Sequence, residues 1–161
     1  MKTLKFFLMA IVAVVFFACT PQETGPSFSV MYNGQEIAEG AVIDVTMDHY
    51  EWGEIVAHVI LRNNASGTET FTMKEVRNYD YTKYIPSFCV NLCMMGNGEK
   101  EQTWEVGELG SGEEFADLAM HLRVADQPAA NCPGTFTFSN GKESLSFTFN
   151  FIYDPGLIPA E

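Results

Sequence analysis

The stretch that decides the fold lies near the end of the chain, at residues 135–151, and reads TFTFSNGKESLSFTFNF. Phenylalanines alternate with small polar residues on both sides of Asn140-Gly141. Period-two alternation is typical of a strand with one buried face, and Asn-Gly is a strong signal for a hairpin turn. We therefore expect an antiparallel hairpin whose phenylalanine face is buried, each ring contributing on the order of 2–3 kcal/mol to stability.

The same pattern recurs in the residues that precede this hairpin. Alternation or short apolar runs bounded by turn residues predict strands at 28–32, 41–47, 55–62, 70–76, 88–94 and 102–106. Residues 115–124 also alternate, although a short helix is an alternative there, and residues 77–86 are expected to form a loop. Eight or nine short strands without a long helix predict an all-β fold, an Ig-like or fibronectin-like antiparallel β-sandwich over residues 27–154. Residues 155–161 are expected to form a loose tail.

The N-terminus predicts an exported protein. Residues 1–18 contain two lysines followed by an apolar run, which suits a signal peptide and is too short for a transmembrane helix of roughly 20 residues. The run ends in Phe-Phe-Ala before Cys19, which resembles the lipobox of bacterial lipoproteins. That resemblance implies cleavage before Cys19 and a membrane anchor through lipidation of its thiol. The alternative is an ordinary secretory signal. Residues 19–26 would then be the lipidated cysteine and a flexible tether.

Charge narrows the range of partners. Without residues 1–18 the chain has 143 residues, enough for one domain, and seven basic residues against 21 acidic ones give a net charge of −14. A charge this negative argues against nucleic acid as a partner and against direct adhesion to anionic lipid.

Three cysteines remain if Cys19 is acylated. A disulfide between Cys89 and Cys93 requires a tight turn, because residues four apart on a straight strand lie about 13 Å apart. Pairing of either residue with Cys132 is the alternative. A redox role is not expected, because the spacing differs from the thioredoxin type.

The sequence contains no recognisable catalytic or cofactor motif. It shows neither a serine–histidine–aspartate pattern nor a glycine-rich phosphate loop, so we expect no enzyme activity and no cofactor. Cys93-Met94-Met95, together with His121 and Cys132, contains the soft ligand types that suit Cu(I). Nothing in the sequence brings these residues together, so no metal site is predicted.

Aromatic residues in predicted loops are the best candidates for a binding site. Trp52, Tyr79, Tyr81 and Tyr84 either cap the open ends of the sandwich or form an exposed surface. Exposed aromatic rings stack on sugars and anchor protein partners.

Several of these features together resemble the small immunoglobulin-like domains of exported proteins and lipoproteins of Bacteroidota. The residues that carry the resemblance are Asn33-Gly34, 56–64, Phe88-Cys89 with Cys93, and 134–151. The resemblance implies an Ig-like sandwich and provides no catalytic residues to transfer.

The sequence thus predicts a cell-envelope lipoprotein whose non-enzymatic Ig-like domain serves binding or scaffolding, with a protein or glycan as partner. The alternative is a carbohydrate-binding accessory of an outer-membrane glycan uptake system. Thr20 follows Cys19, where lipoproteins retained at the inner membrane carry Asp, so the outer membrane is favoured. Whether the domain faces the periplasm or the cell surface stays open.

Overall fold

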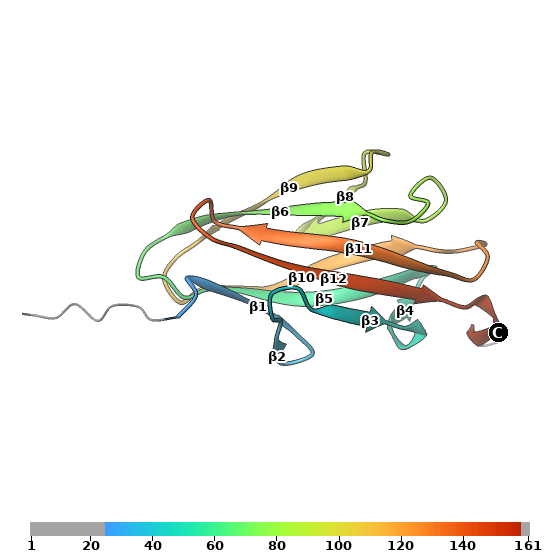
Figure 1. Cartoon of the computed structure of the whole chain (residues 1–161), viewed down its shortest axis with the longest axis horizontal. Coiled ribbons are helices and arrows are strands. Elements are labelled where there is room, and N and C mark those ends of the chain that lie inside the picture. Colours follow the sequence, from blue (N-terminus) through green and yellow to red (C-terminus); the bar gives the residue numbers. More distant parts are fainter. Residues whose placement is uncertain (1–24, 159–161) are drawn as a thin grey trace, which may run out of the picture.

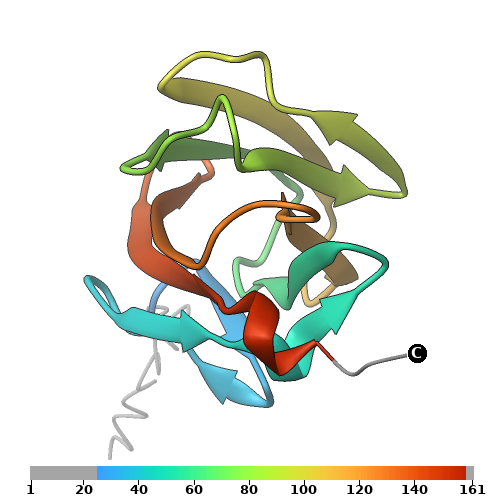
Figure 2. The ribbon, with the colours of Figure 1, turned by 90° about the vertical axis from the view of Figure 1, so that its right-hand side faces the viewer.

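The computed structural model describes residues 25–158. The predicted signal peptide, Cys19 and most of the tether lie outside the described residues, as do residues 159–161. The described chain forms two β-sheets packed face to face, as the end-on view shows most clearly (Figures 1 and 2). This confirms the predicted β-sandwich.

The first sheet has seven strands. They are β1 (Phe28–Tyr32), β2 (Gln35–Glu36), β4 (Tyr50–Glu51), β5 (Glu54–Asn63), β7 (Ile85–Val90), β8 (Leu92–Met95) and β10 (Glu114–Arg123). Their order is β2-β1-β5-β10-β7-β8, with β4 paired to β5. The segment for which a short helix was the alternative is therefore strand β10.

The second sheet has five strands. They are β3 (Val42–Val45), β6 (Glu69–Arg77), β9 (Glu101–Leu109), β11 (Ala130–Ser139) and β12 (Ser144–Tyr153), and their order is β3-β12-β11-β6-β9. All neighbours are antiparallel except β3 and β12, which pair in parallel. The prediction that all strands are antiparallel is therefore wrong at this edge. The chain enters β3 from the first sheet and not through a hairpin from β12, so β3 is free to run parallel to it.

The β11–β12 hairpin supplies much of the core, as predicted. Phe136 lies opposite Phe147, and both rings are buried. Phe149 packs against Phe136, Phe147 and Phe151, with ring centroids 5.1–6.1 Å apart. The last paired residues of the hairpin are Ser139 and Ser144. The turn is therefore longer than the two-residue Asn-Gly turn that the sequence predicts.

The strand count exceeds the expected eight or nine for two reasons. Strand β4 has only two residues, too few to show alternation, whereas the two-residue β2 lies within the return strand expected over residues 35–38. The segment 88–94, expected as one strand, turns back at Asn91 to form β7 and β8.

Two short 3₁₀ helices complete the described chain, η1 (Met47–His49) and η2 (Pro155–Leu157). η2 falls where a loose tail was expected, and Ile158 after it packs against the core. Within residues 25–158, no helix has the length and apolar character needed to cross a membrane.

Candidate binding surfaces

The chain enters the domain at one end of the sandwich, at Ser27. The backbone N–H and the hydroxyl of Ser27 both donate to Glu143 Oε2, at 2.9 and 2.7 Å, and so fix the entry point to the β11–β12 turn. The turns that join β5 to β6 and β9 to β10 lie at the same end (Figure 1). Asn63 holds these two turns together, because its side-chain N–H groups donate to the carbonyls of Gly67 and Leu109.

Trp52 lies at the opposite end, at the tip of the β4–β5 hairpin. Because β5 runs antiparallel to β1, the turn that precedes β5 is placed away from the start of β1. Trp52 is 98% exposed. Its φ is +51° and that of Gly53 is +86°, so both turn residues are left-handed. Such turns favour Asn-Gly, and a tryptophan in the first position is unusual.

The other three candidate aromatics do not form one exposed surface with Trp52. Tyr84 is buried, and its hydroxyl donates to the carbonyl of Pro128 at 2.8 Å. Tyr79 packs against the core and donates to Glu75 Oε1 at 3.1 Å. Tyr81 is half-buried. Tyr79 and Tyr84 therefore close the end of the sandwich, which was one of the two expectations for these rings, and Trp52 alone projects fully into solvent.

A buried ion pair lies beneath the Trp52 end of the sandwich, and the sequence analysis did not predict it. Glu75 and Arg77 point inward from β6, and Arg77 Nε donates to Glu75 Oε2 at 2.9 Å. Arg77 also donates to the Glu99 carbonyl and to Gln102 Oε1, and its guanidinium lies 5.5 Å from the centroid of the Trp104 ring. Their buried positions continue the inward alternation of β6, a signal that the sequence contained.

Burial sets the ionisation behaviour of this cluster. It raises the pKa of Glu75, while the positive charge of Arg77 and the hydrogen bonds from Arg77 and Tyr79 act in the opposite direction. Burial and the neighbouring Glu75 carboxylate also raise the pKa of Tyr79. The charged groups of Glu75 and Arg77 are thus partnered inside the sandwich, whereas the buried ring N–H of Trp104 has no hydrogen-bond partner among the described residues.

Cys89 and Cys93 form a disulfide across the β7–β8 hairpin, as predicted. The two residues lie directly opposite one another, with Cα atoms 3.9 Å apart. The required turn is provided by Asn91, whose φ is +59°. Cys132 is free and buried, so the alternative pairing with Cys132 does not occur. Burial raises the pKa of the Cys132 thiol to about 12.

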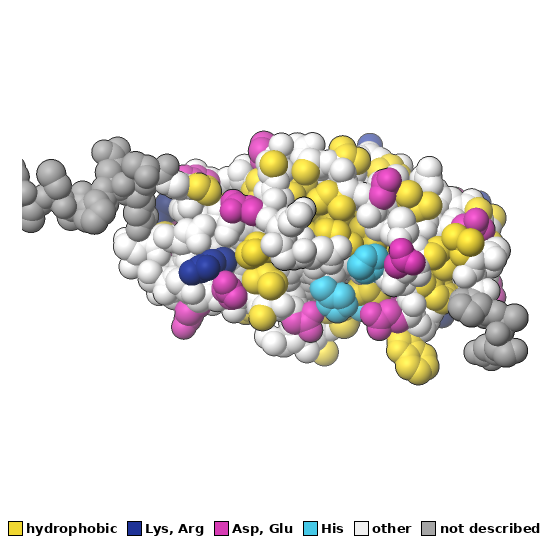
Figure 3. All heavy atoms as spheres, turned by 90° about the horizontal axis from the view of Figure 1, so that it is seen from below, with side chains coloured by type: hydrophobic (Ala, Val, Ile, Leu, Met, Phe, Trp, Pro, Cys, Tyr) yellow, Lys and Arg dark blue, Asp and Glu magenta, His cyan; other side chains and the backbone are white. Residues whose placement is uncertain are grey.

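The outer face of the first sheet carries two histidine–carboxylate pairs. His58 Nδ1 lies 2.7 Å from Asp117 Oδ1, and His121 Nδ1 lies 2.8 Å from Glu54 Oε2. Histidine and acidic side chains gather near the middle of the molecule in the view of Figure 3. Both pairs join β5 to β10.

His121 also lies beside the disulfide. One donor atom each of Cys89, Cys93 and His121 falls within 4.8 Å of the others. The sequence could not bring these residues together, because the strand order and the register of three strands decide their contact. Among the described residues they form the one group of three metal-ligand side chains this close together, with the two sulfurs joined in the disulfide.

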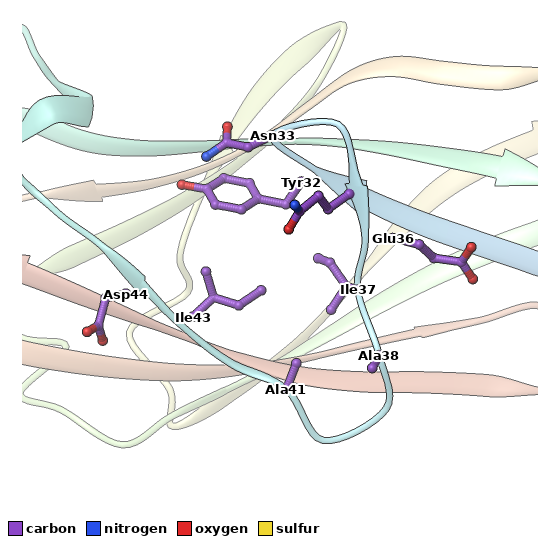
Figure 4. Close-up of a pocket in the computed structure, with 9 residues that line it drawn as sticks. Tyr32, Asn33, Glu36, Ile37, Ala38, Ala41, Ile43 and Asp44 are labelled. Carbon is purple, nitrogen blue, oxygen red and sulfur yellow. The ribbon is translucent and has the colours of Figure 1, made fainter.

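A shallow pocket of about 500 Å³ lies between the β1–β2 hairpin and β3. Figure 4 shows Tyr32, Ile37 and Ile43 around the hollow. Glu36 and Asp44 lie on opposite sides of it and point away from it (Figure 4). Two carboxylates arranged in this way cannot act together on one bound substrate.

Comparisons with known proteins support the fold alone. No family model and no curated protein matches the chain. Among solved structures, the N-terminal domain of PorA is similar with a TM-score of 0.54 at 14% identity, covering 79% of this chain and 97% of that one. The CooA pilin subunit from enterotoxigenic Escherichia coli has a TM-score of 0.37 at 10% identity, over 81% of this chain and 100% of that one. A family 123 glycoside hydrolase from Clostridium perfringens has a TM-score of 0.38 at 7% identity, covering 71% of this chain and 23% of that one. The likeness to the PorA domain agrees with the β-sandwich described above.

Proposed function

We propose that the chain is a lipid-anchored protein of the bacterial outer membrane whose β-sandwich binds or scaffolds a partner without catalysis. The observation that carries this proposal is the separation of Ser27 from Trp52. A lipid anchor at Cys19 with a short tether would hold the Ser27 end near the bilayer. The Trp52 turn, whose ring is fully exposed, would then point away from the membrane toward a partner.

The arrangement of the polar residues supports a non-enzymatic role. Within residues 25–158, the carboxylates of the pocket point apart, and the histidine–carboxylate pairs lie on an outer sheet face. Ser87 is paired with His121 on the neighbouring strand, yet no hydrogen bond joins their side chains in the described part of the chain. A nucleophile and its base need to be within hydrogen-bond reach.

The anchor is tested by metabolic labelling with an alkyne-tagged fatty acid. We expect the wild-type chain and a Cys132→Ala control to incorporate the label and Cys19→Ala to lose it. Absence of label from the wild-type chain would contradict the anchor. Protease treatment of intact and lysed cells then separates surface exposure from a periplasmic position.

The binding surface is tested by site-specific photo-crosslinking in living cells. A photoreactive amino acid at position 52 is compared with one at Ser111, which is exposed in the β9–β10 turn at the opposite end. We expect a discrete adduct from position 52 and none from position 111. Equal adducts from both positions, or none from either, would contradict the proposed direction.

Glycan binding is the second candidate, and the exposed Trp52 ring favours it. Stacking of a single exposed ring on a sugar contributes about 1 kcal/mol of binding free energy, so the expected affinity is modest. Affinity electrophoresis through gels with embedded polysaccharide tests this, with Trp52→Ala compared to Leu92→Ala, which removes another exposed apolar side chain. Retardation of wild type and Leu92→Ala, but not of Trp52→Ala, would support a glycan ligand.

A further inference from the structure

Three metal-ligating side chains meet on the outer face of the first sheet. Cys89 on β7 lies opposite both Cys93 on β8 and Ala119 on β10, so these three residues form one row across the sheet. His121 is two residues beyond Ala119 and therefore points to the same face. This register explains why one donor atom of each of Cys89, Cys93 and His121 lies within 4.8 Å of the others.

His121 is already oriented as a metal-binding histidine would be. Its Nδ1 is engaged with Glu54 Oε2 at 2.8 Å, which leaves Nε2 available as a ligand atom. Histidines that bind metals usually hold their second ring nitrogen against a carboxylate or carbonyl, which sets the tautomer and the direction of the ring. The carboxylate also adds negative charge beside the site.

We propose that reduction of the Cys89–Cys93 disulfide converts this cluster into a binding site for a soft cation, Cu⁺ or Zn²⁺. A dithiol reductant transfers two electrons and two protons to the disulfide, which becomes two thiols while the reductant becomes a disulfide. The metal then replaces the two thiol protons, which are released to solvent, and the sulfurs become thiolate ligands. While the disulfide is intact neither sulfur is available as a thiolate, so the redox state gates the site.

The donor set selects the class of ion. Two thiolates and one imidazole are soft or borderline ligands, which suit Cu⁺ and Zn²⁺ and are poor for Ca²⁺ and Mg²⁺. Met95 is two residues beyond Cys93, on the same face and exposed, so its thioether is a further soft ligand for Cu⁺. Cys132 is fully buried and cannot substitute for either cysteine.

The site is tested by metal competition on the reduced full chain, purified in detergent and carrying Cys19→Ala so that position 19 contributes no sulfur ligand. Cu⁺ and Zn²⁺ are each titrated anaerobically against a chromophoric chelator. We expect one equivalent of at least one ion to bind the reduced chain and none to bind the oxidised chain. His121→Gln and Glu54→Gln should each weaken binding at least 10-fold. His58→Gln, on the same face but outside the cluster, should bind as wild type.

A second readout reports directly on the two cysteines of the site. Bound metal should slow alkylation of Cys89 and Cys93 in the reduced wild-type chain, as followed by mass spectrometry, and His121→Gln should remove this protection. Binding of neither ion to the reduced chain, or equal binding by wild type and His121→Gln, would overturn the proposal. Equal binding by the oxidised and reduced chains would overturn it as well.

Discussion

Removing the positive charge of Arg77 should destabilise the domain more than removing any surface charge. The Arg77 side chain is 0% exposed and its partner Glu75 is 2% exposed. In Arg77→Met the Glu75 carboxylate stays buried and keeps only the hydrogen bond from Tyr79. Loss of one partner from a buried ion pair typically costs about 3–5 kcal/mol, because the other charge is left uncompensated. That is a large share of the roughly 5–15 kcal/mol that stabilises a native domain.

The pH dependence of this loss follows from Glu75. Burial raises the pKa of Glu75 in the folded state, so the folded chain holds this proton more tightly than the unfolded chain. The contribution of Glu75 to stability is therefore greatest at acidic pH and is lost as the pH rises through the folded pKa. Arg77→Met removes the charge that opposed this shift and raises the pKa further. The variant should thus lose less stability relative to wild type at pH 5 than at pH 8.

Urea unfolding of the disulfide-intact chain measures both effects, with wild type and variant compared at each pH. Lys74→Met is the matched control, because Lys74 lies on the same strand in an exposed ion pair with Glu101 and should cost less than about 1 kcal/mol. The loss caused by Arg77→Met in a Glu75→Gln background, measured against Glu75→Gln alone, should not change between pH 5 and pH 8, since neither chain has a carboxyl group at position 75 to ionise. A loss below 1 kcal/mol for Arg77→Met, or a larger loss at pH 5 than at pH 8, would refute this reasoning.

Three further substitutions give measurable outcomes by urea unfolding. Trp52→Asn should stabilise the domain by about 1 kcal/mol, because the exposed ring loses no burial and asparagine tolerates a left-handed φ; destabilisation would mean that the ring packs on the fold. Phe149→Ala should cost about 3–5 kcal/mol, because it leaves a cavity among four aromatic rings, and a loss below 2 kcal/mol would contradict this. Cys93→Ser should cost at most about 2 kcal/mol, since the bridge closes a very short loop; a loss above 4 kcal/mol would show another role.

The hairpin at 135–151 was predictable because its signal is local. Alternation over two strands determines which face is buried, and the turn residues lie between them in the sequence. The parallel pairing of β3 with β12 had no such signal. It joins segments about a hundred residues apart, and alternation in each strand is the same whether the partner runs parallel or antiparallel.

The inward positions of Glu75 and Arg77 show a different limit. Their alternation with Phe71 and Met73 was visible in the sequence, but charged residues in a strand normally indicate a solvent-facing side. Only the structure shows that Tyr79, Gln102 and a backbone carbonyl satisfy both charges inside the sandwich. The contact of His121 with the disulfide was beyond prediction for a related reason, since it requires the register of β7, β8 and β10 at once.

The conformation of Trp52 bears on function because the fold gives no reason for this residue. A left-handed φ is unfavourable for tryptophan by about 1–2 kcal/mol, and asparagine or glycine would form the same turn with less strain. The exposed ring adds no packing to the core, unlike Tyr84, which is buried and closes the same end of the sandwich. Large exposed aromatic residues are typical centres of binding surfaces. A contact with a partner would account for the strain, the exposure and the position away from Ser27 together.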